Sequence, residues 1–556
     1  MQKQTQNSSY QDKYSFRENG NGSRYRPWLY AAVILLLIPA LYINLGLMTL
    51  IDDEAIRCLV ALEMKLSGNY ITPTLNGGFY YNKPPLYNWI LLIYFELAQV
   101  FNEFVARIPT TVAILGFGLT IIYFFKKHTD LHTAILTALA FVTCGRILWY
   151  DSMLALIDIT FSWVTFIGFM VIYHQFQKGN LWKLFLYSYF FTALGFLMKG
   201  FPSIVFQGTT LLAFFIYKRQ FKRLFSLPHI AGGVLFLLIV GAYYFAYHQY
   251  NPIQEVLPTL FNESSKRTVA NHGLGKSFLH FLTFPFEMVY HFLPWSLLII
   301  YFLRGDVLEM IRRHQFLSYL LLIFLCNIFI YWISPQVFPR YLFMFVPLIF
   351  GPFLFLHHQH KKEKSWQFRF LDRLFFVLCT LVALGSFTPL FLERVQSTPL
   401  LYPVTITMST LLIALVVLYH RLPKERFLIL VLVLLVLRIG FNWFVLPDRY
   451  GEDFGTICKN TSIEVGKKFA DQELYVYKYT IMQPTNAFYI TNARKQIVKR
   501  HLTNFVPGAL YIIDPEEYPE AVYTKVGEFK VRHGKLTYDV GILNTATSSA
   551  SPQVEE

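Results

Sequence analysis

Residues 29–57 read LYAAVILLLIPALYINLGLMTLIDDEAIR, an apolar run that ends in a cluster of acids. The run from Leu29 to Leu50 is long enough to cross the roughly 30 Å hydrocarbon core of a bilayer, and no small-residue cleavage site follows it. Arg24 and Arg26 precede the run, so the positive-inside rule predicts an uncleaved first span with a cytoplasmic N-terminus over residues 1–27. The acids then lie at the outer end of this span.

The composition extends this interpretation to most of the chain. Of 556 residues, 54% are hydrophobic and only 15% are charged, and the mean hydropathy is +0.40. A soluble protein carries about 25% charged residues, because it needs a polar surface. Apolar stretches of spanning length recur between residues 28 and 446. The sequence therefore predicts an α-helical polytopic membrane protein.

The net charge of +15 is distributed as short basic clusters between the apolar stretches. This pattern is typical of cytoplasmic loops, whereas a nucleic-acid interface needs one contiguous basic patch. The clusters are Lys126/Lys127, Lys218 to Arg223, Arg312/Arg313, Lys361 to Lys364 and Arg421 to Arg426. We therefore expect no nucleic-acid partner.

About thirteen spans are predicted when residues 85–101, which follow a diproline and contain Asn88 and Glu96, are taken as an interfacial helix. A span there would turn most basic clusters outward. The predicted limits are 28–50, 105–125, 132–149, 157–176, 183–198, 202–217, 228–247, 288–303, 316–333, 338–357, 369–391, 400–419 and 426–446. Two long outer loops, 51–104 and 248–287, suggest a catalytic face, since a helix bundle alone does not need them.

The composition changes after residue 446. Alternating apolar patterns at 474–479, 487–490, 509–513 and 535–540, with a helical stretch near 462–470, predict a small extracytoplasmic α/β domain over 447–543. We expect the Ser/Ala/Thr-rich tail 544–556 to be disordered. No internal repeat is evident, which weighs against a transporter built from inverted repeats.

Two positions hold candidate carboxylates. Asp53 and Glu54 directly follow the first span, where acids either cap the next helix or supply a general base. Asp158 is embedded in apolar sequence, where an ionisable group is costly and indicates function. Asp158 is preferred over Asp151, which is expected to be solvated in a short loop.

Basic groups accompany these acids on the predicted outer face. Lys83 precedes Pro84-Pro85, whose stiff backbone suits a fixed phosphate ligand, although a lysine that only anchors an interfacial helix remains an alternative. Lys199 stands at the outer end of a span, against the positive-inside rule. Arg340 heads another span, and His272 lies in the second outer loop, where most histidines are simply solvated.

These motifs together resemble the GT-C superfamily of membrane glycosyltransferases. The resemblance is to families 39 and 83, which hold protein O-mannosyltransferase-like enzymes and the aminoarabinose transferases of lipid A. It covers residues 28 to 450, and the C-terminal domain resembles the lipid A branch. The residues that carry it are Asp53-Glu54-Ala55 with Arg57, Ser67-Gly68-Asn69-Tyr70, Thr74-Leu75-Asn76-Gly77, Lys83-Pro84-Pro85-Leu86-Tyr87, Ile157-Asp158, Leu197 to Pro202, Leu293-Pro294-Trp295 and Arg340-Tyr341.

The resemblance implies an inverting transfer of a sugar from a polyprenyl-phosphate donor at a site outside the membrane of a bacterial cell. No cofactor is required; a divalent cation held by acids near the phosphate remains an alternative. The acceptor is lipid A or another glycolipid, with a protein as the alternative and a lipid or solute transporter as a remote one. The implied roles are catalytic for Asp53, Asp158 and Glu54, phosphate-binding for Lys83, Lys199, Arg57 and Arg340, and pocket-lining for Tyr80, Asn82, Tyr341 and His272. Many relatives carry Glu where this chain has Asn82, which leaves the sugar and the acceptor open.

Overall fold

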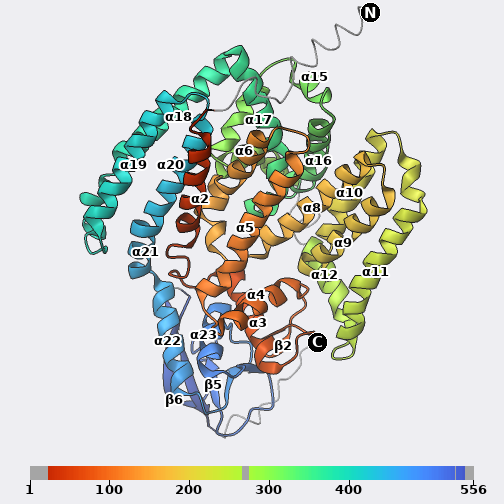
Figure 1. Ribbon diagram of the computed structural model, residues 1–556. Coiled ribbons are helices and arrows are strands. Elements are labelled where there is room, and N and C mark those ends of the chain that lie inside the picture. The colour runs from red at the N-terminus through yellow and green to blue at the C-terminus, as the bar shows by residue number, and fades with distance from the viewer. Residues whose placement is uncertain (1–22, 266–273, 533, 545–556) are drawn as a thin grey trace, which may run out of the picture.

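The computed structural model describes residues 23–265, 274–532 and 534–544. Figure 1 shows a bundle of long helices that stands on a smaller domain built around a β-sheet, with short elements from the first outer segment between them. The predicted pocket residue His272 and most of the predicted tail lie outside the described residues.

Eight described helices are long and apolar enough to cross a membrane. The bent pair α6 (Leu131–Val142) and α7 (Gly145–Trp149), with the short turn after it, makes a ninth if it forms one span. Six of them are α5 (Glu103–Phe125), α8 (Ile157–Gln177), α9 (Leu181–Lys199), α11 (Leu227–His248), α16 (Gln315–Trp332) and α19 (Leu401–Arg421). The other two begin with α18 (Trp366–Gly385) and α20 (Arg426–Gly440) and continue as helix to Leu390 and Tyr450. The predicted helical membrane fold is confirmed.

Among the described residues, the helices that are long and apolar enough to cross a membrane are fewer than the thirteen predicted spans. Helix α2 (Arg26–Tyr42) ends early because the chain turns at Asn44, whose φ of 56° lies in the left-handed region. Helix α10 (Pro202–Tyr217) is also short. The remaining helical segments of the bundle are η4 (Trp295–Phe302), α14 (Leu274–His291), α15 (Val307–Arg312), η5 (Pro339–Leu342) and α17 (Val346–Glu363).

The segment expected to lie along the interface forms helix α4 (Leu86–Ala98). Its 13 residues rise about 20 Å, which is less than the hydrocarbon core of a bilayer. It packs against α3 (Asp52–Ser67) and α5. Its length therefore fits an interfacial helix and not a span.

The first outer segment is folded around two buried glutamates of α3. Glu63 accepts hydrogen bonds from the Thr74 hydroxyl (2.7 Å) and the Asn76 backbone N–H (2.7 Å), and so holds the hairpin of β1 (Thr74–Leu75) and β2 (Gly78–Phe79). Glu54 is 0% exposed and accepts from Arg107 Nε (3.0 Å) and Nη2 (2.8 Å) on α5. It also accepts from the Ala155 backbone N–H at 2.7 Å, just before α8. Glu54 therefore fixes α3 against two helices of the bundle.

The C-terminal part contains the predicted sheet. Its strand order is β4-β3-β5-β7-β6, with β3 parallel to β4 and β5, and β7 antiparallel to β5 and β6. The strands are β3 (Leu474–Tyr477), β4 (Lys499–His501), β5 (Leu510–Ile513), β6 (Tyr523–Val531) and β7 (Leu536–Leu543), and the helices are α21 (Leu446–Glu452), α22 (Phe454–Lys468) and α23 (Pro484–Arg494).

One predicted strand is wrong, because residues 487–490 lie in α23. All four of their side chains are buried, and a short apolar run that is buried on every side carries no periodicity that separates a strand from a helix. Pro484 at the first turn starts this helix.

Helix α23 also joins the sheet domain to the bundle. The Tyr489 hydroxyl donates to Glu103 Oε1 (2.6 Å) at the start of α5 and accepts from the Leu50 backbone N–H (3.1 Å). The Arg500 backbone N–H donates to the Asn76 carbonyl (3.2 Å) in the β1–β2 turn. The sheet domain therefore supports the first outer segment from below in the view of Figure 1.

We expect Glu54→Gln to destabilise the protein strongly, because it leaves the Arg107 guanidinium buried without its carboxylate. Breaking a buried pair from one side costs about 3–5 kcal/mol. Thermal unfolding of the purified protein in detergent would show a clearly lower Tm. Glu96→Gln is the matched control, since it removes the exposed ion-pair partner of Lys65 and should leave the Tm nearly unchanged. An equal Tm for both variants would contradict the role of Glu54.

Candidate active site

A cavity of about 360 Å³ opens where the first outer segment meets the ends of α8, α9 and η5. Eight of the eleven predicted site residues line it, although they come from four separate parts of the chain. These are Asp53, Arg57, Tyr80, Asn82, Lys83, Asp158, Lys199 and Tyr341. The fold therefore brings together side chains for which the sequence predicts only a position on the same side of the membrane.

Two carboxylates of the cavity are bridged by one guanidinium. Arg340 donates from Nη2 to Asp53 Oδ2 at 2.9 Å. Its Nε lies 3.5 Å from Asp158 Oδ2, which is close enough for an ion pair but is not a hydrogen bond. Arg340 thus contacts catalytic candidates and is a poorer candidate for the donor phosphate than its predicted role implied.

The two carboxylates differ in their surroundings. Asp158 is only 4% exposed and is also paired with Lys199, whose ammonium lies 4.0 Å from the centre of the Tyr341 ring. Asp53 is 47% exposed and has Arg340 as its ion-pair partner. The charge of Asp158 is thus balanced by two cations within the protein, whereas Asp53 keeps an accessible oxygen for a ligand.

Arg57 and Tyr80 form the second polar contact of the cavity wall. Arg57 Nη2 donates to the Tyr80 hydroxyl, and the guanidinium lies 5.1 Å from the centre of the ring. Burial raises the pKa of Tyr80, and Arg57 only partly offsets this effect. Tyr80 therefore stays neutral. The Arg57 Nη1 atom is buried and makes no hydrogen bond to the described protein, so it is available to an anionic ligand.

Lys83 is placed by the backbone that follows it. Pro84 and Pro85 lead directly into α4, whose first turn begins at Leu86. The side chain of Asn88 in that turn donates to the Arg57 carbonyl at 2.9 Å, which ties α4 to α3. Lys83, in the turn before α4, and Arg57, on α3, therefore reach the same cavity from two segments that are fixed to each other.

Glu54 departs from its predicted catalytic role. Asp53 and Glu54 are adjacent on α3 and point in different directions, because successive residues of a helix are about 100° apart. Asp53 faces the cavity, while Glu54 is buried in the contact with Arg107. The acid run therefore contains one ligand-accessible carboxylate and one that holds the fold.

Sequence reasoning missed several residues of the cavity. Glu263 comes from α12 (Val256–Ser265), Tyr331 from α16, and Gln336 from the turn after α16. A sequence feature that could have pointed to Glu263 is its spacing, because it lies seven residues after Val256 and three after Leu260, which are both buried on the same helix. Its loop, 248–287, is too divergent from the relatives to support an acceptor assignment, and the one residue there to which the resemblance gave a role is His272.

A second cavity lies beside the first and is almost purely apolar. Its volume is about 210 Å³, and its lining comes from α14, η4, α16 and α17. Trp332 and Leu342 line it, while their sequence neighbours Tyr331 and Tyr341 line the polar cavity. On α16 and on η5, two consecutive residues therefore line different cavities.

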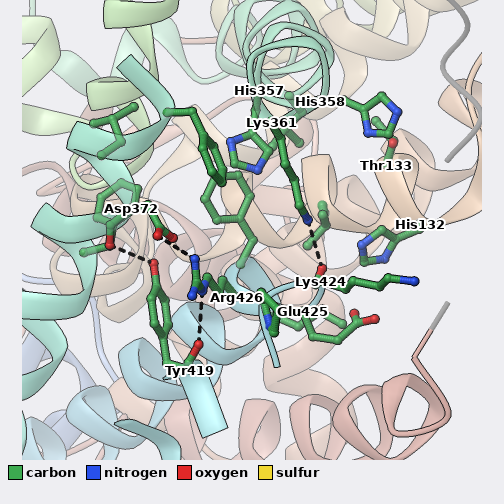
Figure 2. A pocket seen from close by; sticks show the side chains of 18 of the residues that line it. His132, Thr133, His357, His358, Lys361, Asp372, Tyr419, Lys424, Glu425 and Arg426 are labelled. Carbon is green, nitrogen blue, oxygen red and sulfur yellow. Dashed lines mark hydrogen bonds and ion pairs between the residues drawn. The ribbon is translucent and has the colours of Figure 1, made fainter. Parts of the chain in front are cut away.

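A third cavity, of about 50 Å³, lies at the opposite end of the bundle, where α6 and α20 begin (Figure 2). Arg426 there is paired with Asp372, and Glu425 is paired with Arg26. Asp130 accepts from the Thr133 backbone N–H at 3.0 Å as the cap of α6. Because its acids are used in pairs and caps, and because it is small, this cavity is not the candidate active site.

Within the described ranges, no group of three or more His, Cys, Asp or Glu side chains has an arrangement that would hold a metal ion. In the polar cavity, Asp53 and Asp158 share Arg340. A guanidinium between two carboxylates takes the position that a bridging cation would need.

Comparison with known proteins agrees with this architecture. Residues 82–245 match the family model described as dolichyl-phosphate-mannose-protein mannosyltransferase. An uncharacterised protein of Aquifex aeolicus is 25% identical over 304 residues, which are 52% of this chain and 58% of the relative. The undecaprenyl phosphate-alpha-4-amino-4-deoxy-L-arabinose arabinosyl transferase of Pseudomonas savastanoi is 26% identical over 240 residues, 41% of this chain and 43% of the relative. These alignments span about half the length of each relative.

Solved structures extend the similarity to nearly the whole chain. The crystal structure of ArnT from Cupriavidus metallidurans bound to undecaprenyl phosphate superposes with a TM-score of 0.67 at 17% identity, covering 96% of this chain and 100% of that one. The apo structure of the same protein gives a TM-score of 0.65 at 16% identity, with the same coverage. The chain therefore has an ArnT-like fold over nearly its whole length.

Proposed function

We propose that this protein is an inverting glycosyltransferase that moves a sugar from a polyprenyl-phosphate donor to an acceptor on the outer face of the membrane. The observation that carries the proposal is the polar cavity, in which the accessible carboxylate of Asp53 lies with the cations Lys83 and Arg57. A carboxylate for the acceptor and cations for the leaving group are the two parts that this reaction needs.

The adjacent apolar cavity supports a lipid-linked donor. A phosphate at Lys83 and Arg57 would place its polyprenyl chain within reach of the apolar cavity bounded by Trp332 and Leu342. Hydrocarbon is stabilised in such a lining because it leaves water. The ArnT structure with bound undecaprenyl phosphate shows that this fold holds such a lipid in one relative.

In the proposed step, an oxygen of the acceptor attacks the anomeric carbon of the sugar. The bond between that carbon and the phosphate oxygen breaks, and its electron pair stays on the polyprenyl phosphate. Lys83 and Arg57 stabilise the developing charge, as donors do in an oxyanion hole. Asp53 takes the proton when the acceptor is a hydroxyl, and orients the acceptor when it is a phosphate.

The proposed acceptor is lipid A or another cell-surface glycolipid. The name of the Pseudomonas savastanoi relative gives the donor and no acceptor, so the proposal of a lipid acceptor rests on the resemblance of the sequence motifs to the lipid A branch. Transfer to a protein is the second candidate, because the family model that matches residues 82–245 is described as a protein mannosyltransferase.

We expect Asp53→Asn and Lys83→Gln each to lower transfer at least about 100-fold, the usual effect of removing a general base or a charge-stabilising donor. Lys83→Gln should also weaken binding of undecaprenyl phosphate, whereas Asp53→Asn should not. Cells lacking the gene would be complemented with each variant, and their glycolipids compared by mass spectrometry.

The control for this experiment is Glu96→Gln, which restores the wild-type lipid profile. A sugar adduct that disappears from lipid A in Asp53→Asn cells identifies the acceptor. An unchanged glycolipid profile in cells without the gene contradicts a lipid acceptor and favours a protein. Full activity of both site variants would refute the assignment of the cavity.

We propose that the transfer needs no metal ion, since the carboxylates that would hold one share Arg340. Activity of the purified protein should therefore be unchanged in EDTA. An activity that is lost in EDTA and returns with Mg²⁺ or Mn²⁺ would contradict this proposal.

We propose that the cavity and the sheet domain face the periplasm of a bacterial inner membrane. The five native cysteines are buried or half-buried, so single exposed cysteines can be introduced against a low background. In intact spheroplasts an impermeant thiol reagent should label Glu520→Cys in the sheet domain and spare Lys126→Cys in the loop after α5. Both side chains are exposed in the structure. Labelling of Lys126→Cys alone would mean that the protein has the opposite orientation in the membrane and would contradict the proposal.

A further inference from the structure

The polar cavity contains a third carboxylate, that of Glu263, whose role neither the resemblance nor the proposed reaction assigns. It lines the cavity together with Asp53, Tyr80, Asn82 and Lys83. It comes from α12, which belongs to the second outer segment and not to the membrane helices.

The packing of α12 aims Glu263 at the cavity. Val256 and Leu260 are 4% and 2% exposed and pack in a cluster with Leu197, Tyr243 and Tyr247. Residues three, four and seven apart lie on one face of a helix. Glu263, seven residues after Val256 and three after Leu260, therefore lies on the buried face.

The opposite side of α12 is open, since Leu257 and Phe261 are 47% and 61% exposed. An acid on the buried face of a short helix replaces an apolar residue that would pack better. We therefore expect its carboxylate to contact a ligand in the cavity.

The charge of Glu263 also opposes the binding of a phosphate. Burial raises the pKa of Tyr80, and the charge of Glu263 adds to this rise. An added negative charge repels a phosphate monoester in the same cavity. This repulsion is offset if another part of the same ligand donates hydrogen bonds to the carboxylate.

We propose that Glu263 is a specificity-determining residue that binds the transferred sugar through its hydroxyl groups or through an ammonium group. An ionised carboxylate only accepts hydrogen bonds, and both kinds of sugar substituent donate them. The inference rests on the proposed function, since it takes the polyprenyl-phosphate sugar as the ligand. Glu263 then distinguishes the sugar-linked lipid from the sugar-free lipid phosphate that remains after transfer.

Binding to the full-length protein in detergent tests the inference without requiring turnover. The probes are undecaprenyl phosphate, undecaprenyl phosphate-mannose and undecaprenyl phosphate-4-amino-4-deoxy-L-arabinose. We expect Glu263→Gln to weaken at least one sugar-linked probe by about tenfold or more, as for the loss of a hydrogen bond to a charged group. Binding of undecaprenyl phosphate should stay equal or become tighter, because the repulsion is gone.

Two further variants separate a sugar contact from a structural effect. Glu255→Gln removes an exposed acid just before α12 and should bind all three probes as the wild type does. Asn82→Glu in the Glu263→Gln background returns a carboxylate to the same cavity from the α4 side and should restore part of the sugar preference.

The pattern across the probes decides the outcome. Selective weakening of the aminoarabinose probe indicates an ammonium partner, and weakening of both sugar-linked probes indicates hydroxyl partners. Equal weakening of all three probes would mean that Glu263 only supports the fold, and unchanged binding of all three would mean that it contacts no sugar. Either result overturns the proposal. Wild-type protein that binds the probes but transfers no sugar would instead refute the proposed reaction and leave the binding test of Glu263 valid.

Discussion

The site depends on the buried contact between Glu54 and Arg107. Glu54 joins α3 to α5 through the guanidinium and to the residues before α8 through the Ala155 backbone N–H. Asp53 is the residue before Glu54, and Asp158 follows Ala155 by three positions. The contact that closes the outer end of the bundle therefore also sets the two candidate carboxylates at a distance that one arginine bridges. Because both partners of the contact are buried, separating them would leave each charge unpaired in a low-dielectric environment, which is costly.

The charges of the polar cavity are arranged by burial. The deeper acid, Asp158, is held between Lys199 and Arg340, so its charge is balanced within the protein. The shallower acid, Asp53, remains half exposed beside Lys83 and Arg57. The buried charges thus belong to the framework of the cavity, whereas the half-exposed Asp53 is accessible to a ligand. In the proposed reaction, the cations would face the donor phosphate and Asp53 would face the acceptor.

The outer segments complete a cavity that the helices only begin. The α3–α4 segment supplies Asp53, Arg57 and Lys83, and α12 supplies Glu263. The sheet domain holds the first of these segments through Tyr489 and Arg500. Helices that span a bilayer must satisfy their own backbone hydrogen bonds, so most of the variation open to such a fold lies in its outer segments. The choice of substrate is therefore expected to depend more on these segments than on the bundle.

The sequence by itself determined the helical membrane class, the C-terminal sheet domain and most of the polar residues that line the cavity. A long apolar run is stable in a bilayer, and an ionisable residue within such a run is costly there, so both features can be recognised in the sequence alone. Asp53, Lys83, Asp158 and Lys199 were found in this way. The tertiary structure alone decided which of two adjacent acids faces the ligand, because the burial of Glu54 depends on Arg107, 53 residues away. It also decided that Arg340 bridges two carboxylates, that 487–490 is helical, and that α12 turns Glu263 into the cavity. These properties arise from contacts between distant segments, which no local pattern of residues specifies.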